Sequence, residues 1–189
     1  MRYLVVCGGK IDKEFGLNEI KTDGIDAIIA ADSGMDFLYE NGVTPDIIVG
    51  DFDSATTKAL EFFERKGQTE IHRLNPIKDD TDTEYAIRLA IREGARSIVV
   101  LGATGSRIDH VLGNISLLGI GLESKTDISI IDTNNRIRMA DKPVTIEKSA
   151  QYGRFVSLIA VTDDNEVSLR GFKYPVTDYS FDRFTSLGI

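Results

Sequence analysis

Short hydrophobic runs alternate with segments of helical periodicity along the first two thirds of the chain. The runs cover residues 3–7, 27–31, 46–49, 70–74, 97–101 and 128–131. Most of them are continuously apolar, which is typical of strands that are buried on both faces of a parallel sheet. The runs therefore predict a parallel sheet.

Three helices are predicted between these runs. Residues 55–66 form the first, and Gly67 marks its end. Residues 81–93 form the second, which opens with the capping-box pattern Thr81-x-x-Glu84. The third covers residues 107–123, where apolar side chains recur at helical spacing. Strands that alternate with helices predict an α/β fold with a Rossmann-like parallel sheet.

The pattern changes after about residue 135. Strand-like pieces follow without a convincing helix between them, at residues 144–147, 155–161, 166–169 and 184–187. We therefore predict an α/β domain over residues 1–135 and a smaller all-β domain over residues 140–189.

Composition and charge narrow the class of protein. The 189 residues carry a formal net charge of −8, which argues against nucleic acid as the main partner. The single cysteine, Cys7, lies within an apolar run and is expected to be a buried, inert thiol. We find neither a signal-peptide pattern nor an apolar run of about 20 residues, so we expect a cytoplasmic protein without a membrane partner.

Polar residues gather where the predicted strands end. The clusters are Ala31-Asp32-Ser33-Gly34, Gly50-Asp51-Phe52-Asp53-Ser54, Lys78-Asp79-Asp80-Thr81-Asp82 and Gly102-Ala103-Thr104-Gly105-Ser106-Arg107. Ligands of open parallel sheets bind beyond the carboxyl ends of the strands. Together these clusters predict a binding site at that edge.

The two acidic clusters each allow two interpretations. Asp51 and Asp53 stand two apart, which in extended chain puts both side chains on one face, where they would share Mg²⁺. Alternatively, Asp53 or Ser54 caps the helix that follows. Thr81 is expected to cap its own helix, but capping does not require Asp79 and Asp82 as well, so a metal or substrate role is predicted for at least one acid of 79–82.

The glycine-containing segment 102–107 leads from a strand into a helix, where free backbone N–H groups favour phosphate. It is neither a Walker A loop nor a GxGxxG motif. Arg107, His110 and Asn114 share one face of that helix and suit a nucleotide, although a polar helix edge is the simpler alternative. Asp109 has a structural alternative too, because Ser106-x-x-Asp109 resembles a capping box.

Several known chemistries do not match these residues. The haloacid dehalogenase pattern fails because Ala55 stands where Thr or Val is needed, and the Gly-x-Ser-x-Gly elbow of hydrolases is absent. Metal-assisted phosphoryl chemistry remains. The residues by themselves indicate a magnesium-dependent nucleotide enzyme with an acidic site for a second substrate.

In this order, the four clusters resemble the motifs of the thiamine pyrophosphokinase family. His110, Asn114 and the segment Gly171-Phe172-Lys173-Tyr174-Pro175 extend the resemblance over most of the chain. It implies pyrophosphoryl transfer from ATP to the hydroxyl of thiamine, giving thiamine diphosphate and AMP. It also implies that the β domain is a sandwich and that the enzyme is a homodimer.

The resemblance assigns roles by position. Asp51, Asp53 and Asp79 would hold Mg²⁺, with Asp82 in support of this catalytic cluster. The nucleotide side would comprise Asp32, Gly102, Thr104, Gly105, Arg107, Asp109, His110 and Asn114. Lys78 and Ser186 would contact the thiamine substrate.

The end of the sequence departs from the family pattern. The family's chain normally continues beyond the Ser-Leu-Gly found here at 186–188, whereas this sequence ends at Ile189. The β domain is therefore expected to be truncated. Two other functions stay open: a magnesium-dependent kinase or phosphohydrolase acting on another small alcohol, and a non-catalytic nucleotide-binding module.

Overall fold

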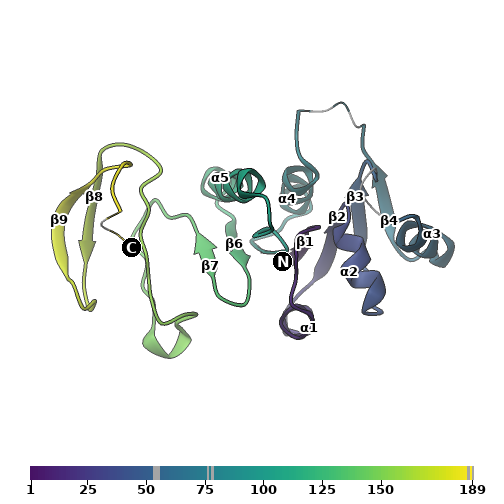
Figure 1. The fold of residues 1–189 in the computed structure, drawn as a ribbon, viewed down its shortest axis with the longest axis horizontal. Coiled ribbons are helices and arrows are strands. Elements are labelled where there is room, and N and C mark those ends of the chain that lie inside the picture. Colours follow the sequence, from purple (N-terminus) through teal and green to yellow (C-terminus); the bar gives the residue numbers. More distant parts are fainter. Residues whose placement is uncertain (53–55, 76, 78, 187, 189) are drawn as a thin grey trace. The chain divides into compact units, whose positions relative to one another are not determined.

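A seven-stranded sheet dominates residues 1–147 of the computed structural model, which describes residues 1–52, 56–75, 77, 79–186 and 188 (Figure 1). The strands are β1 (Arg2–Val6), β2 (Ala27–Ala31), β3 (Ile47–Gly50), β4 (Glu70–Arg73), β5 (Ser97–Leu101), β6 (Asp127–Ile131) and β7 (Arg136–Arg138). Their order is β4-β3-β2-β1-β5-β6-β7, and only β7 pairs antiparallel with its neighbour. The predicted parallel sheet and the α/β fold class are confirmed.

Helices cover both faces of this sheet (Figure 1). They are α1 (Lys13–Ile20), α2 (Gly34–Glu40), α3 (Thr57–Lys66), α4 (Asp82–Arg92) and α5 (Ile108–Ser124). Tyr3 and Val5 of β1 pack in the core under α4 and α5, whereas Leu4 and Val6 pack in the core under α2 and α3. Successive side chains of a strand point to opposite faces, so one apolar run supplies both cores.

The predicted helix ends agree with the observed caps. Gly67 follows α3 in the left-handed conformation, with φ of 64°. The Thr81 hydroxyl accepts a hydrogen bond from the Glu84 backbone N–H at the start of α4. Cys7 is buried, as predicted.

Three elements of this unit were not predicted, namely α1, α2 and β7. Helix α1 has a weak apolar stripe interrupted by Gly16, although Asp12 caps it by accepting from the Phe15 backbone N–H. Helix α2 has only seven residues. Elements this short carry too little periodicity to be recognised by pattern alone.

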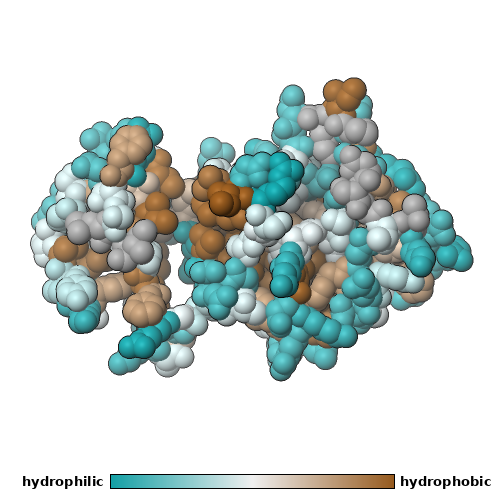
Figure 2. Space-filling view, in the orientation of Figure 1, coloured by the Kyte–Doolittle hydropathy of each residue, from teal (hydrophilic) through white to brown (hydrophobic). Residues whose placement is uncertain are grey.

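Residues 148–189 form a second compact unit. It contains the short 3₁₀ turn η1 (Lys148–Ala150) and an antiparallel pair, β8 (Asn165–Leu169) and β9 (Val176–Phe181). The strand predicted at 166–169 is confirmed, whereas those at 144–147 and 155–161 are wrong, because these segments have no ladder partner among the described residues. Large apolar side chains of this unit, such as Phe155 and Ile159, face solvent, and Figure 2 shows hydrophobic surface here.

Within the described residues, every helix is too short or too polar to cross a membrane.

Candidate active site

Three aspartates from separate parts of the sequence meet at the carboxyl edge of the sheet. They are Asp32 after β2, Asp51 after β3, and Asp82 in the first turn of α4. One carboxylate oxygen of each lies within 4.8 Å of those of the other two, and all three residues are half-buried. Negative charges this close repel each other, so the group is suited to a hard cation.

Local backbone geometry places the first two of these acids. Asp32 has a left-handed φ of 47°, and its backbone N–H donates to the Val49 carbonyl oxygen at 2.8 Å. Phe52 is also left-handed, with φ of 63°. Asp53 falls outside the described residues, so the shared face predicted for Asp51 and Asp53 stays a prediction.

The third acid is placed by the start of α4. Thr81 caps this helix, and the Thr83 hydroxyl in its first turn donates to the Cys7 sulfur at 3.4 Å. This contact holds the start of α4 against the residue that follows β1. Asp82, in the same turn of α4, thereby lies close to Asp32 and Asp51. Burial raises the pKa of the Cys7 thiol to about 11, so the thiol stays protonated and is no nucleophile.

The other residues predicted for the metal and substrate side can be compared with this group only where the structure describes them. Asp79 is exposed and lies outside the three-carboxylate cluster. Asp53 and Lys78 fall outside the described residues. Asp32, which we assigned to the nucleotide, is instead a member of the cluster. Ser186 is exposed and belongs to the second unit, residues 148–189.

Glycines let the loops approach one another closely at this edge. A Cβ on Gly34 would lie 1.9 Å from the Val6 carbonyl oxygen. Gly102 has φ of 70°, and a Cβ there would lie 2.4 Å from the Cys7 carbonyl oxygen. Side chains at either position would push apart the strand ends that carry the site.

The loop after β5 is fastened to α5. Asn114 Nδ2 donates to the carbonyl oxygen of buried Ala103 at 2.9 Å. Thr104 and Gly105 in the same loop are half-buried and Gly102 is buried, whereas His110 is exposed. Of the residues predicted for the nucleotide, Asn114 therefore shapes the loop directly.

Arg107 and Asp109 pair with each other at the exposed start of α5. Arg107 donates two hydrogen bonds to the Asp109 carboxylate, at 2.6 and 3.2 Å. The Arg107 hydrogen bond lowers the pKa of Asp109. Arg107 is the N-cap residue and makes no side-chain cap, so the alternative capping box from Ser106 to Asp109 is wrong.

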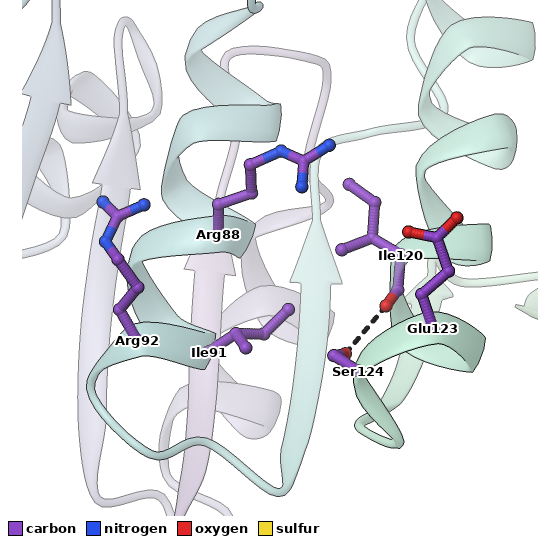
Figure 3. A pocket seen from close by; sticks show the side chains of 6 residues that line it. All are labelled: Arg88, Ile91, Arg92, Ile120, Glu123 and Ser124. Atoms are coloured by element: carbon purple, nitrogen blue, oxygen red, sulfur yellow. Dashed lines mark hydrogen bonds between the residues drawn. The ribbon is translucent and has the colours of Figure 1, made fainter.

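The described residues of this unit form recesses on its surface, of which we consider a pair. One, of about 340 Å³, lies between α4 and α5, where Arg88 extends across from α4 and Ile91 faces Ile120 (Figure 3). Its lining includes Arg92 and Ser124 in the last turns of the two helices, away from the acidic cluster at the start of α4.

The other recess, of about 330 Å³, lies at the carboxyl edge between the loops that follow β1, β5 and β6. Its lining includes Gly102 and Thr104, which we predicted, and Lys10, Thr133 and Asn134, which we did not. The polar run 132–135 directly follows a strand and is the signal that could have identified the last two.

Comparisons with known proteins agree with this arrangement. Residues 21–131 match the family model "Thiamin pyrophosphokinase, catalytic domain", and residues 143–189 match "Thiamin pyrophosphokinase, vitamin B1 binding domain". Thiamine pyrophosphokinase of Bacillus subtilis is 36% identical over 152 residues, which are 79% of this chain and 70% of the relative.

Solved structures agree as well. The crystal structure of thiamine pyrophosphokinase from Bacillus subtilis has a TM-score of 0.87 and 32% identity, covering 100% of this chain and 88% of that one. The enzyme from Geobacillus thermodenitrificans has a TM-score of 0.75 and 27% identity, covering 97% and 84%. The resemblance predicted from the motifs is thus confirmed, and the chain is an enzyme of the thiamine pyrophosphokinase family.

Proposed function

We propose that this enzyme transfers the pyrophosphoryl group of ATP to the hydroxyl of thiamine, giving thiamine diphosphate and AMP, with Mg²⁺ at the aspartate cluster. The observation that carries this proposal is the convergence of Asp32, Asp51 and Asp82 at one edge of the sheet. Membership of the family supplies the substrates.

The donor set fits Mg²⁺. Asp32, Asp51 and Asp82 provide hard oxygen ligands within 4.8 Å of one another, and each is partly open to water, which Mg²⁺ retains in its coordination sphere. When bound, Mg²⁺ supplies positive charge that neutralises the phosphate oxygens of ATP. Asp53 and Asp79, predicted as further ligands, remain candidates for this site.

The other residues of the chain bind and orient the substrates. Asn114 fixes the loop 102–106, whose backbone N–H groups face the phosphates in this proposal. Arg107 is held by Asp109 and exchanges this partner for a phosphate oxygen when ATP binds. The net negative charge attracts the cationic thiazolium ring of thiamine.

The transfer requires a base and a site for thiamine. A carboxylate near the cluster accepts the proton of the thiamine hydroxyl as its oxygen attacks the β-phosphorus and AMP leaves. The thiamine site includes Lys78 and Ser186, predicted from the family resemblance. The enzyme acts in the cytoplasm as a homodimer in this proposal.

A product assay tests the reaction. The chain is incubated with thiamine, Mg²⁺ and ATP labelled at the γ-phosphate, and the nucleotide product is separated. We expect AMP and labelled thiamine diphosphate in equal amounts. Formation of ADP or free phosphate would point to a kinase or phosphohydrolase, and binding of ATP without turnover would point to a nucleotide-binding module.

Charge-removing variants test the cluster. We expect Asp51→Asn and Asp82→Asn to abolish turnover while the fold survives, because each removes one metal ligand. Asp23→Asn is the matched control, since Asp23 is exposed in the turn before β2, at the opposite edge of the sheet. A near-normal rate in Asp51→Asn would count against the metal assignment.

A further inference from the structure

The loop that follows β3 and carries Asp51 is held at its far end by a side chain of α2. The carboxylate of Asp36, in the first turn of α2, accepts a hydrogen bond from the Thr56 backbone N–H at 3.3 Å and another from the Thr56 hydroxyl. Thr56 is the residue at which this loop ends and α3 begins. The bonds therefore join the start of α2 to a residue 20 positions further along the chain.

The Thr56 hydroxyl is used for this contact in place of a local cap. Thr56 occupies the N-cap position of α3, where a threonine hydroxyl ordinarily accepts a hydrogen bond from the first turn of its own helix. Here the side chain makes no such cap, and the first turn of α3 contains no acidic residue. The negative charge that favours a helix N-terminus comes from Asp36 of α2 instead.

Asp36 is fixed relative to Asp32, one of the three clustered aspartates. Asp32 directly precedes α2, and its carbonyl oxygen accepts from the Met35 N–H at 3.1 Å. The Asp36 N–H donates to the Ser33 carbonyl oxygen at 3.0 Å in the same turn. Met35 and Leu38 are fully buried, so the helix is packed firmly on the sheet. Through Asp36, the segment that carries Asp32 restrains the loop that carries Asp51.

The loop after β3 needs such restraints. Phe52 has φ of 63°, which a bulky residue adopts only where its surroundings hold it there. The neighbouring Asp51 belongs to the three-carboxylate cluster, whose like charges repel one another until a cation neutralises them. The Arg73 guanidinium on β4 lies over the Phe52 ring, 5.4 Å from its centre, and supplies one restraint. The bonds between Asp36 and Thr56 supply another.

We infer that Asp36 is a positioning residue for the metal site: through Thr56 it holds the loop after β3, so that the Asp51 carboxylate stays in place for the cation. The inference rests on the proposed function, which places Mg²⁺ at the three-carboxylate cluster. Asp36 is not a member of that cluster, and its carboxylate is engaged with Thr56, so it acts without contacting the ion. A site that is already ordered binds its ligand more tightly, because less conformational entropy is lost on binding.

Titration of the protein with Mn²⁺ alone tests the inference without ATP or turnover. Mn²⁺ takes the same carboxylate oxygen ligands as Mg²⁺, and electron paramagnetic resonance measures the unbound ion. We expect Asp36→Ala and Thr56→Val each to raise the Kd for Mn²⁺ by a factor of about 3–10, because each removes hydrogen bonding to a charged group. Their effects should not add in the double variant, since both break one contact.

Conservative variants separate positioning from direct ligation. Asp36→Asn keeps an oxygen that accepts from Thr56, and Thr56→Ser keeps the hydroxyl, so both should bind Mn²⁺ nearly as well as the wild type. A metal ligand would behave differently: Asp36→Asn would weaken binding as much as Asp36→Ala, and Thr56→Val would leave the Kd unchanged. That pattern would overturn the positioning role.

Thr44→Val is the matched control. It removes the hydroxyl that accepts a hydrogen bond from Lys66, at the other end of α3, so it should leave the Kd for Mn²⁺ unchanged. Equal weakening by Thr44→Val and Thr56→Val would show a general loosening of α3 and would contradict the inference.

Hydrogen exchange of the metal-free protein measures the loop directly. We expect residues 47–52 to exchange faster in Asp36→Ala and Thr56→Val than in the wild type. Unchanged exchange together with an unchanged Kd would refute the role of Asp36 and leave the proposed metal site intact. A wild-type protein that binds no Mn²⁺ would refute the metal site itself, and the exchange rates would then show independently whether Asp36 holds the loop.

Discussion

Asn114 Nδ2 donates a hydrogen bond to the carbonyl oxygen of Ala103 at 2.9 Å, joining the second turn of α5 to the loop that precedes the helix. Ala103 is 2% exposed, so water cannot replace this donor. We expect Asn114→Ala to lower the free energy of unfolding by about 1–3 kcal/mol, the usual cost of an unpaired buried acceptor. Urea unfolding measures this change.

The same variant should loosen the loop and weaken ATP binding, so the KM for ATP should rise while the KM for thiamine stays constant. Ser116→Ala is the control on the same helix, since the Ser116 hydroxyl contacts only the Leu112 carbonyl oxygen. Equal stability of Asn114→Ala and Ser116→Ala would show that the Asn114 bond contributes nothing.

Asp32 combines a functional carboxylate with a left-handed backbone, and two substitutions separate these properties. Asn tolerates φ of 47° whereas Ala does not, so Asp32→Ala should be less stable than Asp32→Asn by about 1 kcal/mol. Both lose the carboxylate, so both should lose activity by a factor on the order of 100. Thermal unfolding and turnover are measured together, and substantial activity in Asp32→Asn would remove Asp32 from the proposed metal site.

Two glycines should respond in opposite directions to the same substitution. Gly102→Ala introduces a Cβ 2.4 Å from the Cys7 carbonyl oxygen at a left-handed position, and we expect a loss of at least about 2 kcal/mol. Gly113 lies within α5, where an added Cβ meets nothing within 4 Å, so Gly113→Ala should stabilise by about 1 kcal/mol. Denaturant midpoints compare the two, and a neutral Gly102→Ala would contradict the close packing of these loops.

The carboxylate of Asp132 should make stability depend on pH. Burial raises its pKa, but hydrogen bonds from Thr104, Asn134 and Asn135 outweigh burial, so the folded-state pKa lies below the ordinary value of 3.8. The ionised Asp132 carboxylate therefore stabilises the folded state fully above pH 3.8, where the unfolded residue is also ionised. This stabilisation is lost as pH falls through the pKa of Asp132 in the folded state.

Asp132→Asn should accordingly be less stable than the wild type at pH 7, and the difference should shrink at pH 3. Urea unfolding of both proteins at the two pH values gives this comparison. A difference that grows on acidification would mean that Asp132 is not stabilised in its charged form.

The Cys7 thiol should resist modification in the folded protein. It is 5% exposed and burial raises its pKa to about 11, so little thiolate is present or accessible at pH 8. Iodoacetamide should label it only after urea is added, which mass spectrometry detects. Rapid labelling of the native protein would show that β1 and α4 separate readily.

The sequence predicted the central strands of the sheet well and residues 148–189 poorly, and the reason is physical. Strands buried on both faces, such as β1 and β5, must be apolar throughout, so their sequence is unambiguous. In residues 148–189, the nearly continuous apolar run at 155–161 resembled a strand but has no ladder partner among the described residues. The more polar segment Val176–Phe181 pairs with β8 instead.

The candidate site was predicted in part for a similar reason. The location of Asp51 and Asp82 was predicted from the ends of the strands, because the topology of a parallel sheet brings those ends to one edge. The position of Asp32 in the cluster depends on left-handed backbone at residues 32 and 52, which no periodicity reveals. The recess was missed because its loops after β1 and β6 are far apart in the sequence.

The position of β1 between β2 and β5 in the sheet also has a consequence during protein synthesis. Residues 2–6 leave the ribosome before the other strands of the sheet, yet one of their two partners, β5, begins at Ser97. At 5–20 residues per second, the intervening residues take roughly 5–20 s to appear. During that interval the growing polypeptide carries an open hydrophobic edge, which makes it a natural client for ribosome-associated chaperones.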